Sequence, residues 1–229
     1  MNILKKIEVF GDSILKGIQL NPKNNRYCVE NNIDTALLSK KYSLSIENHS
    51  IFGCTITKGF SLLERHYKKV ESCDTVILEY GGNDCNFNWK EISERPFDNH
   101  MPSTPLNVFT ETYKQIISKL KESGINVILT NLPPLEPQRF FDWFCRDFNK
   151  ENILKWLGNV NSIYRFQENY SRTVEKIAFE TNSLLVDLRG AFLRQKRIDG
   201  LFCEDGIHPN TEGQNLITKA FLDFADTIA

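Results

Sequence analysis

The chain has 229 residues, of which 41% are hydrophobic and 25% are charged, and its formal net charge is −1. This length and composition predict a single globular domain over residues 1–229, with no basic excess for binding nucleic acid or an anionic membrane. No apolar run approaches the ~18 residues of a membrane span. The stretch "IEVF" after the N-terminal lysines is too short for a signal peptide, so we expect a cytoplasmic protein.

The cysteines are scattered along the chain without a C-x-x-C pair: Cys28, Cys54, Cys73, Cys85, Cys145 and Cys203. Without a secretion signal, we expect free thiols rather than disulfide bonds. A zinc site needs closely spaced cysteine or histidine ligands, and the sequence does not have this spacing. It therefore predicts no structural metal.

Short apolar segments, bounded by polar residues, glycine or proline, predict strands at 7–10, 43–50, 74–80, 126–133 and 182–188. Between them, the spacing of apolar residues predicts helices at 34–42, 57–70, 104–124, 158–181 and about 209–226. This alternation predicts a mostly parallel, five-stranded sheet between two layers of helices, which is a three-layer α/β/α sandwich. In such sheets, ligands bind outside the carboxyl ends of the strands.

Two segments interrupt this alternation: a polar connection at 85–105 and an aromatic-rich stretch at about 134–158. Long irregular segments in compact domains often form binding loops, so the second is a candidate aromatic lid or insertion. Its aromatic residues at a spacing of four could equally form one packed helical face. Phe141 and Trp143 fall off that face, and both are candidates to line a substrate site, as is Trp89 in the polar connection.

The stretch "FGDSILKG" follows the first predicted strand and allows three interpretations. A phosphate-binding loop needs G-x-x-x-x-G-K-[ST], but Gly11 and Gly17 are one residue too far apart and an isoleucine follows, which excludes it. The triplet Gly-Asp-Ser could cap a following helix. It could also present Ser13 as a nucleophile, with its backbone amide at a helix N-terminus, where anions are favoured. The stretch alone does not decide between the last two.

A nucleophilic serine needs a base that removes its proton and a partner that orients the base. The stretch "DGIHPN" offers both, because Asp205 stands three residues before His208 and the two can meet on one side of a turn. The same stretch could instead simply begin the last helix, with Asp205 as its cap and Pro209 near its first turn.

Two further stretches follow predicted strands and offer hydrogen-bond donors for the oxyanion of a tetrahedral intermediate. "YGGND" places Asn83 after two glycines, and "FGCT" contains Gly53, whose backbone N–H has no side chain beside it. Each stretch by itself could be an ordinary turn. Together with the backbone amide of Ser13, they complete a set for acyl transfer at the same expected edge of the sheet.

In this order, the four stretches resemble the sequence blocks of the SGNH hydrolases, also called the GDSL esterase/lipase family. "FGDSI", "IFGCT", "GGND" and "DGIHPN" extend over nearly the whole chain, and the first departs from the usual Gly-Asp-Ser-Leu only by its isoleucine. The resemblance implies a flavodoxin-like three-layer fold without a cofactor. It also implies Ser13, His208 and Asp205 as catalytic residues, and Ser13, Gly53 and Asn83 as the oxyanion hole.

The resemblance further implies that the protein hydrolyses a small-molecule carboxylic ester through an acyl-enzyme intermediate. Members of the family cleave esters of lipids, acetylated sugars and aryl alcohols, as well as thioesters, so the fold narrows the reaction more than the substrate. We expect a carbohydrate O-acetyl esterase or a short-chain acyl esterase. The alternatives are a lysophospholipase or thioesterase with a longer acyl groove and, outside the enzymes, a catalytically idle binding protein on the same fold.

Overall fold

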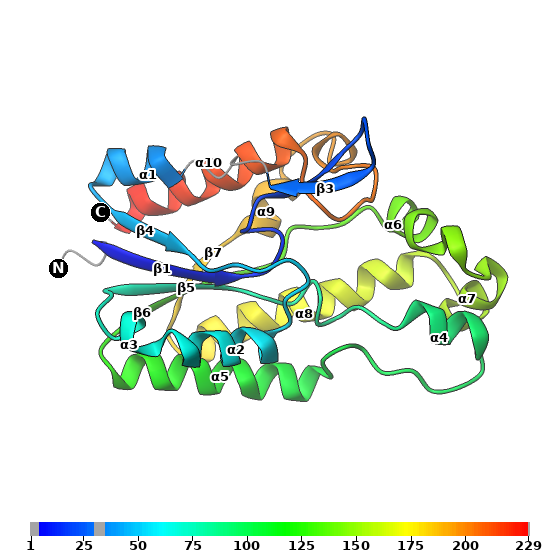
Figure 1. Ribbon diagram of the computed structural model, residues 1–229, viewed down its shortest axis with the longest axis horizontal. Helices are drawn as coiled ribbons and strands as arrows, with labels where there is room; N and C mark the ends of the chain where they lie inside the picture. Colours follow the sequence, from blue (N-terminus) through cyan, green and yellow to red (C-terminus); the bar gives the residue numbers. More distant parts are fainter. Residues whose placement is uncertain (1–4, 30–34, 229) are drawn as a thin grey trace.

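The computed structural model describes residues 5–29 and 35–228. Its centre is a five-stranded sheet in the order β4-β1-β5-β6-β7, in which every neighbouring pair is parallel (Figure 1). The strands are β1 (Lys6–Gly11), β4 (Ser45–Asn48), β5 (Thr75–Glu79), β6 (Asn126–Thr130) and β7 (Leu184–Val186). Each of them overlaps a strand predicted from the sequence, so the predicted parallel sheet is confirmed.

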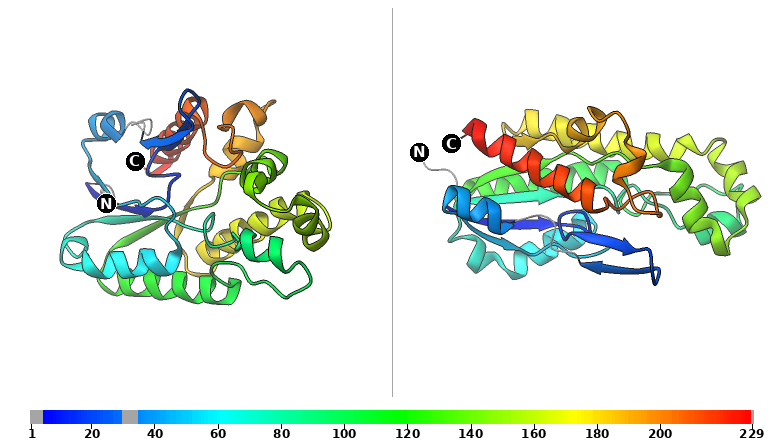
Figure 2. Two further views of the ribbon diagram at one scale, coloured as in Figure 1. Left: turned by 45° about the vertical axis from the view of Figure 1, so that its right-hand side comes forward. Right: turned by 90° about the horizontal axis from the view of Figure 1, so that it is seen from above.

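Helices cover both faces of the sheet and complete the predicted three layers (Figure 1, Figure 2). One face carries α2 (Ile56–Arg65), α3 (Tyr67–Val70), α5 (Leu106–Glu122) and α8 (Asn161–Glu180). The other carries α1 (Thr35–Tyr42), α9 (Leu188–Leu193) and α10 (Thr211–Ile228). The predicted helix at 57–70 is divided at His66 into α2 and α3, and the other predicted helices correspond to α1, α5, α8 and α10.

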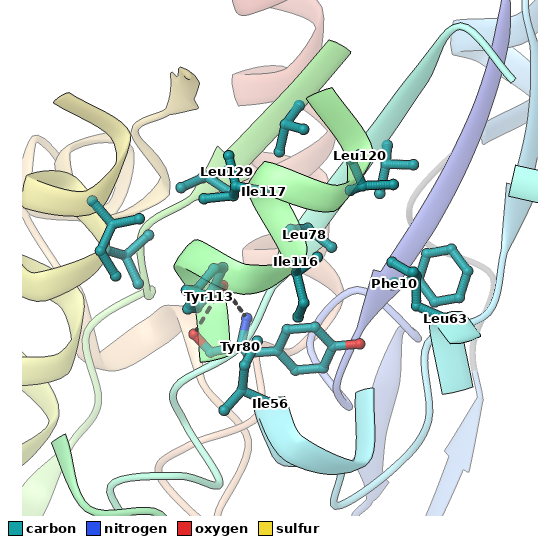
Figure 3. Packing of buried hydrophobic residues seen from close by; sticks show 14 of the residues in the cluster. Phe10, Ile56, Leu63, Leu78, Tyr80, Tyr113, Ile116, Ile117, Leu120 and Leu129 are labelled. Atoms are coloured by element: carbon teal, nitrogen blue, oxygen red, sulfur yellow. Dashed lines mark hydrogen bonds between the residues drawn. The ribbon is translucent and has the colours of Figure 1, made fainter. Parts of the chain in front are cut away.

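The apolar sequence of the strands explains why the sheet is buried on both faces. In β5, Val76 and Leu78 point into the core under α2 and α5, and Ile77 points into the opposite core, because successive side chains of a strand alternate. At the end of β5, the backbone N–H of Tyr80 donates to the phenolic oxygen of Tyr113 on α5 over 3.0 Å (Figure 3). This bond ties the start of the "GGND" stretch to the helix layer.

The stretch that follows β1 differs from the prediction, because no helix follows the Gly-Asp-Ser triplet. Residues 13–17 form a turn in which the N–H of Ile18 donates to the carbonyl of Ser13 over 3.0 Å and Gly17 has a φ of 74°. An antiparallel hairpin of β2 (Ile18–Asn21) and β3 (Arg26–Val29) comes next. The left-handed glycine ends the turn before a helix can propagate, so the amide of Ser13 is not at a helix N-terminus.

The two segments that interrupt the predicted alternation contain helices of their own: α4 (Trp89–Glu94), α6 (Pro137–Phe144), the 3-10 helix η1 (Cys145–Asp147) and α7 (Lys150–Leu157). They lie beyond the carboxyl ends of the strands, at the right of Figure 1, and pack with the first part of α8 in a separate apolar cluster. The candidate lid is thus a packed helical unit beside the edge where a ligand is expected. That it opens as a lid stays a prediction.

The helices over residues 5–29 and 35–228 include none that combines the length and the apolar character needed to cross a membrane. The longest of these helices, α8, has charged residues along its whole length, and one of its faces packs on the sheet.

Candidate active site

Ser13 lies just after β1, on the turn described above, and is buried. Asp12 fixes this turn, because its Oδ1 atom accepts the backbone N–H of Ile14 over 2.8 Å. A second bond joins the N–H of Lys16 to the carbonyl of Asp12 over 3.1 Å. The aspartate of the triplet therefore stabilises the turn that presents Ser13 and does not cap a helix.

His208 and Asp205 reach Ser13 from the loop that precedes α10. The Nε2 atom of His208 lies 3.0 Å from Oγ of Ser13, and its Nδ1 atom lies 2.6 Å from Oδ2 of Asp205. The other carboxylate oxygen of Asp205 accepts the backbone N–H groups of Ile207 and His208, each over 3.1 Å. The three predicted catalytic residues therefore lie in a chain of hydrogen bonds from hydroxyl to imidazole to carboxylate.

Burial and hydrogen bonding act in opposite directions on Asp205. Burial alone would raise the pKa of its carboxyl group, but the bonds from His208 and the backbone hold that pKa below its ordinary value. Asp205 is therefore ionised at neutral pH and can stabilise a positive charge on the buried His208. The turn between them needs Gly206, because its φ is 75° and a Cβ atom there would lie 2.7 Å from the carbonyl oxygen of Glu136.

Gly53 and Asn83, the predicted oxyanion donors, lie on two other loops and line the same cavity as Ser13. Gly53 follows β4 in a left-handed conformation with a φ of 70°. Asn83 donates one Nδ2–H to Oδ2 of Asp12 over 2.8 Å, so the residue next to Ser13 fixes the orientation of this amide. A primary amide has two N–H donors, and the second can serve a ligand.

Asp84 joins the two loops that carry these donors. Its carboxylate accepts the backbone N–H of Ile56, the first residue of α2, over 3.0 and 3.2 Å. Burial raises the pKa of Asp84 to about 6. Because α2 begins three residues after Gly53, this bond holds the loop of Gly53 against the loop of Asn83.

Glu79, the last residue of β5, is a buried acid at this site that sequence reasoning missed. Its Oε2 atom accepts the backbone N–H of Asp12 over 3.1 Å. Burial and the negative charge of Asp12 raise the pKa of Glu79 well above its usual range, so Glu79 keeps its proton and donates it to the Asp12 carboxylate. A chain of bonds thus runs from Glu79 through Asp12 to Asn83. The available signal was an acidic residue in the otherwise apolar strand "TVILE".

A cavity of about 160 Å³ lies beside Ser13 and extends toward α4, α6 and α8. Its wall is mostly apolar and includes Ile14, Tyr27, Phe52, Cys85, Phe87, Trp89, Leu132, Pro133, Leu135, Phe140, Ile163, Phe166 and Ile207. Trp89, which the sequence indicated as a candidate substrate-lining residue, is part of this wall. The cavity joins the Ser13 hydroxyl to an apolar chamber that no single sequence motif indicated.

The expectation for Phe141 and Trp143 needs correction, because neither side chain lines this cavity. On α6, the helical phase turns Phe141 into the apolar cluster, where it is only 3% exposed, and turns Phe140 toward the cavity instead. The ring of Trp143 is covered by the Arg146 guanidinium, 3.8 Å from its centroid, and lies 6.4 Å from the ring of Tyr27.

A group of potential metal ligands lies outside the wall of this cavity, at the β1–β4 edge of the sheet. Carboxylate and imidazole atoms of Glu8, Glu47 and His49 lie within 4.8 Å of one another. These side chains are already paired, since Nε2 of His49 lies 2.6 Å from Oε2 of Glu8 and the ammonium group of Lys69 binds Glu47. We assign no metal to them, and the absence of a metal or cofactor stays a prediction.

Residues 9–216 match the model of the GDSL-like lipase/acylhydrolase family, a range that contains Ser13, Gly53, Asn83, Asp205 and His208. The chain is 27% identical over 146 residues to an arylesterase of Vibrio mimicus. The aligned part covers 61% of this chain, and the chain spans 62% of the length of this curated relative.

Solved structures with a similar fold include a lipase/acylhydrolase from Enterococcus faecalis, with 18% identity and a TM-score of 0.69 over 98% of this chain and 96% of that one. A mutant of an acetyl-xylooligosaccharide esterase from Geobacillus has 23% identity and a TM-score of 0.66 over 96% of this chain and 93% of that one. At these identities, the likeness shows a shared fold and does not extend to a shared substrate.

Proposed function

Because the chain belongs to the GDSL-like lipase/acylhydrolase family, we propose that it hydrolyses carboxylic esters with Ser13 as its nucleophile. The observation that carries this proposal is the contact of His208 with Ser13 at 3.0 Å and with Asp205 at 2.6 Å. A serine, a base and an orienting carboxylate at hydrogen-bond distance form the arrangement that activates a hydroxyl group for acyl transfer.

In the first half of the reaction, Oγ of Ser13 attacks the carbonyl carbon of the ester while its proton passes to Nε2 of His208. Asp205 stabilises the imidazolium that results. When the tetrahedral intermediate collapses, the bond to the alcohol oxygen breaks and His208 gives its proton to the departing alcohol. Ser13 is left as an acyl ester.

In the second half, water takes the place of the alcohol. His208 removes a proton from the water as its oxygen attacks the acyl carbon, and a second tetrahedral intermediate forms. Its collapse breaks the bond to Oγ of Ser13, which recovers its proton from His208, and the carboxylic acid leaves.

The negative charge on the carbonyl oxygen in both intermediates needs donors that are in place before the reaction begins. We assign this role to the backbone N–H groups of Ser13 and Gly53 and to the second Nδ2–H of Asn83. The support for Asn83 is its bond to Asp12, which is itself bonded to Glu79. A donor held in this way stabilises the transition state without having to reorient.

The size of the cavity supports an apolar acyl group of modest length. Its volume of about 160 Å³ is close to the roughly 150 Å³ of an apolar cavity that binds benzene. This space also has to hold the first part of the alcohol half, so a long lipid chain would exceed it, and its mostly apolar wall offers more contact to a butyryl group than to an acetyl group. We therefore favour esters of short- to medium-chain acids over acetylated sugars and long-chain lipids.

Chain length can be tested directly. Burial of each CH₂ group contributes about 0.8 kcal/mol, so two further CH₂ groups should raise kcat/KM by up to about 15-fold from p-nitrophenyl acetate to p-nitrophenyl butyrate. A steady fall in kcat/KM from acetate to butyrate to octanoate would instead favour an acetyl esterase.

A fluorophosphonate probe tests the nucleophile. It should label Ser13 in the wild-type protein and leave the Ser13→Ala variant unlabelled. Hydrolysis of p-nitrophenyl butyrate should fall by at least about 10⁴-fold in that variant, with an unchanged circular dichroism spectrum. A wild-type protein that takes no label and hydrolyses no ester would instead be a binding protein on the same fold.

A further inference from the structure

Two aromatic side chains flank the imidazole of His208 at the mouth of the cavity. Tyr27, on β3, lies 5.0 Å from the His208 ring. Phe52, in the loop that carries Gly53, lies 5.8 Å from it and nearly parallel, at 13°. The rings of Tyr27 and Phe52 are themselves 5.2 Å apart. Two segments remote from each other and from His208 in the sequence therefore converge on the general base of the proposed reaction.

The pair is much more exposed than the imidazole that it surrounds. Tyr27 is 39% exposed and Phe52 is 47% exposed, whereas His208 is 3% exposed. Their near neighbours in the chain, Val29 and Ile51, are exposed as well. Both aromatic residues line the cavity that contains Ser13. Apolar surface that stays open to solvent beside a reactive group marks a place where a ligand binds.

The chemistry of the proposed reaction decides which half of the ester meets this surface. His208 protonates the leaving oxygen, so the alcohol half must lie beside Nε2 of His208. The acyl half lies on the other side of the carbonyl carbon, toward the chamber walled by α4, α6 and α8. Tyr27 and Phe52 contact His208 itself, so they flank the alcohol half.

The surface that Tyr27 and Phe52 form is mostly aromatic. Burial and the nearby Asp205 charge raise the pKa of Tyr27, so its hydroxyl group stays neutral. Farther inside, Asn86 accepts the indole N–H of Trp89 over 2.8 Å. A polyhydroxylated alcohol would find few free partners here, whereas an apolar ring needs none.

We infer that Tyr27 and Phe52 form a leaving-group subsite for a planar aromatic alcohol. This inference rests on the proposed ester hydrolysis and extends it from the acyl half to the alcohol half of the substrate. Aromatic rings stack or meet edge to face at centroid distances of about 4.5–7 Å, and such contacts contribute beyond simple apolar burial. A flat ring can use the faces of Tyr27 and Phe52 in this way, and a puckered aliphatic ring cannot.

Benzyl butyrate and cyclohexylmethyl butyrate test the inference, because they share the acyl group and differ in the planarity of the ring. We expect a higher kcat/KM for the benzyl ester in the wild-type protein. Phe52→Leu should lower kcat/KM for the benzyl ester by about 3- to 10-fold and for the cyclohexylmethyl ester by less than about 2-fold. Phe52→Tyr keeps an aromatic ring at this position, so it should retain the wild-type preference for the benzyl ester. Phe179→Leu, at an exposed phenylalanine near the end of α8, is the matched control.

Both esters form the same butyryl-enzyme, so a defect in its hydrolysis would affect the two alike, and the ratio of their kcat/KM values isolates the leaving-group contact. Equal losses for both esters in Phe52→Leu and in Tyr27→Leu would overturn the inference and leave the esterase proposal intact. A wild-type protein that hydrolyses neither ester and takes no fluorophosphonate label on Ser13 would refute the proposed function itself.

Discussion

Replacement of Glu79 by glutamine tests the buried chain of bonds that orients Asn83. The pKa of Glu79 is raised well above its ordinary value of 4.5 by burial and by the charge of Asp12. In the unfolded chain, the same carboxyl group loses its proton near its ordinary pKa. Above that pH the unfolded state holds fewer protons than the folded state, so the free energy of unfolding falls as pH rises, until the folded pKa is passed.

For one proton, this loss amounts to about 1.4 kcal/mol per pH unit. Glutamine does not titrate, but its amide N–H can donate to Asp12 and its oxygen can accept the Asp12 N–H, so the bonds that Glu79 makes are retained. Between about pH 5 and about pH 6, we therefore expect the stability of Glu79→Gln relative to wild type to increase by up to about 1.4 kcal/mol. We expect kcat to change by less than about 2-fold, because Asn83 stays in place.

Urea denaturation at the two pH values, followed by far-UV circular dichroism, measures this difference. Glu111→Gln, on the exposed face of α5, is the matched control for loss of a glutamate charge. A relative stability that is the same at both pH values, together with a large loss of kcat in Glu79→Gln, would show that Glu79 is ionised in the folded protein and would refute the reasoning.

Asn83→Ala should lower kcat for p-nitrophenyl butyrate by about 10²–10³-fold with little change in KM, because it removes one oxyanion donor; an unchanged kcat in steady-state kinetics would exclude that role. Gly59→Ala should lower the free energy of unfolding in urea by about 1–3 kcal/mol. Its Cβ atom would lie 2.3 Å from the buried Tyr80 ring, whereas Gly200→Ala, with open space around its Cβ atom, should have little effect. Trp89→Ala should enlarge the cavity and shift the optimum of a p-nitrophenyl ester series toward longer acyl chains.

The parallel sheet was predictable because its central strands are buried on both faces. In β5, Val76, Ile77 and Leu78 follow one another without a polar residue, a continuous run that is typical of such sheets. The hairpin of β2 and β3 has no comparable signal. Most of β3 is exposed, and the hairpin turn depends on Asn25 with a φ of 56°, which the printed sequence does not distinguish from an ordinary asparagine.

The motif residues were predictable because each stands at the end of a strand or in a turn that its neighbours in sequence define. The wall of the cavity was not, since separate segments contribute to it and only their packing decides which side chains face inward. Phe140 and Phe141 are adjacent aromatic residues, and the phase of α6 alone decides that the first faces the cavity. The raised pKa of Glu79 also arises only on folding. Glu79 ends β5 and becomes buried beside Asp12, which follows β1.

Trapping of the acyl-enzyme tests the central claim, that Ser13 carries the acyl group, most directly. The enzyme is mixed with excess p-nitrophenyl butyrate, and the reaction is quenched in acid within milliseconds. The protein is then digested, and the masses of its peptides are measured by mass spectrometry. We predict one butyryl group on the peptide that contains Ser13, with a burst of about one p-nitrophenol per enzyme. A butyryl group on a different residue, or hydrolysis by Ser13→Ala at the wild-type rate, would contradict the account.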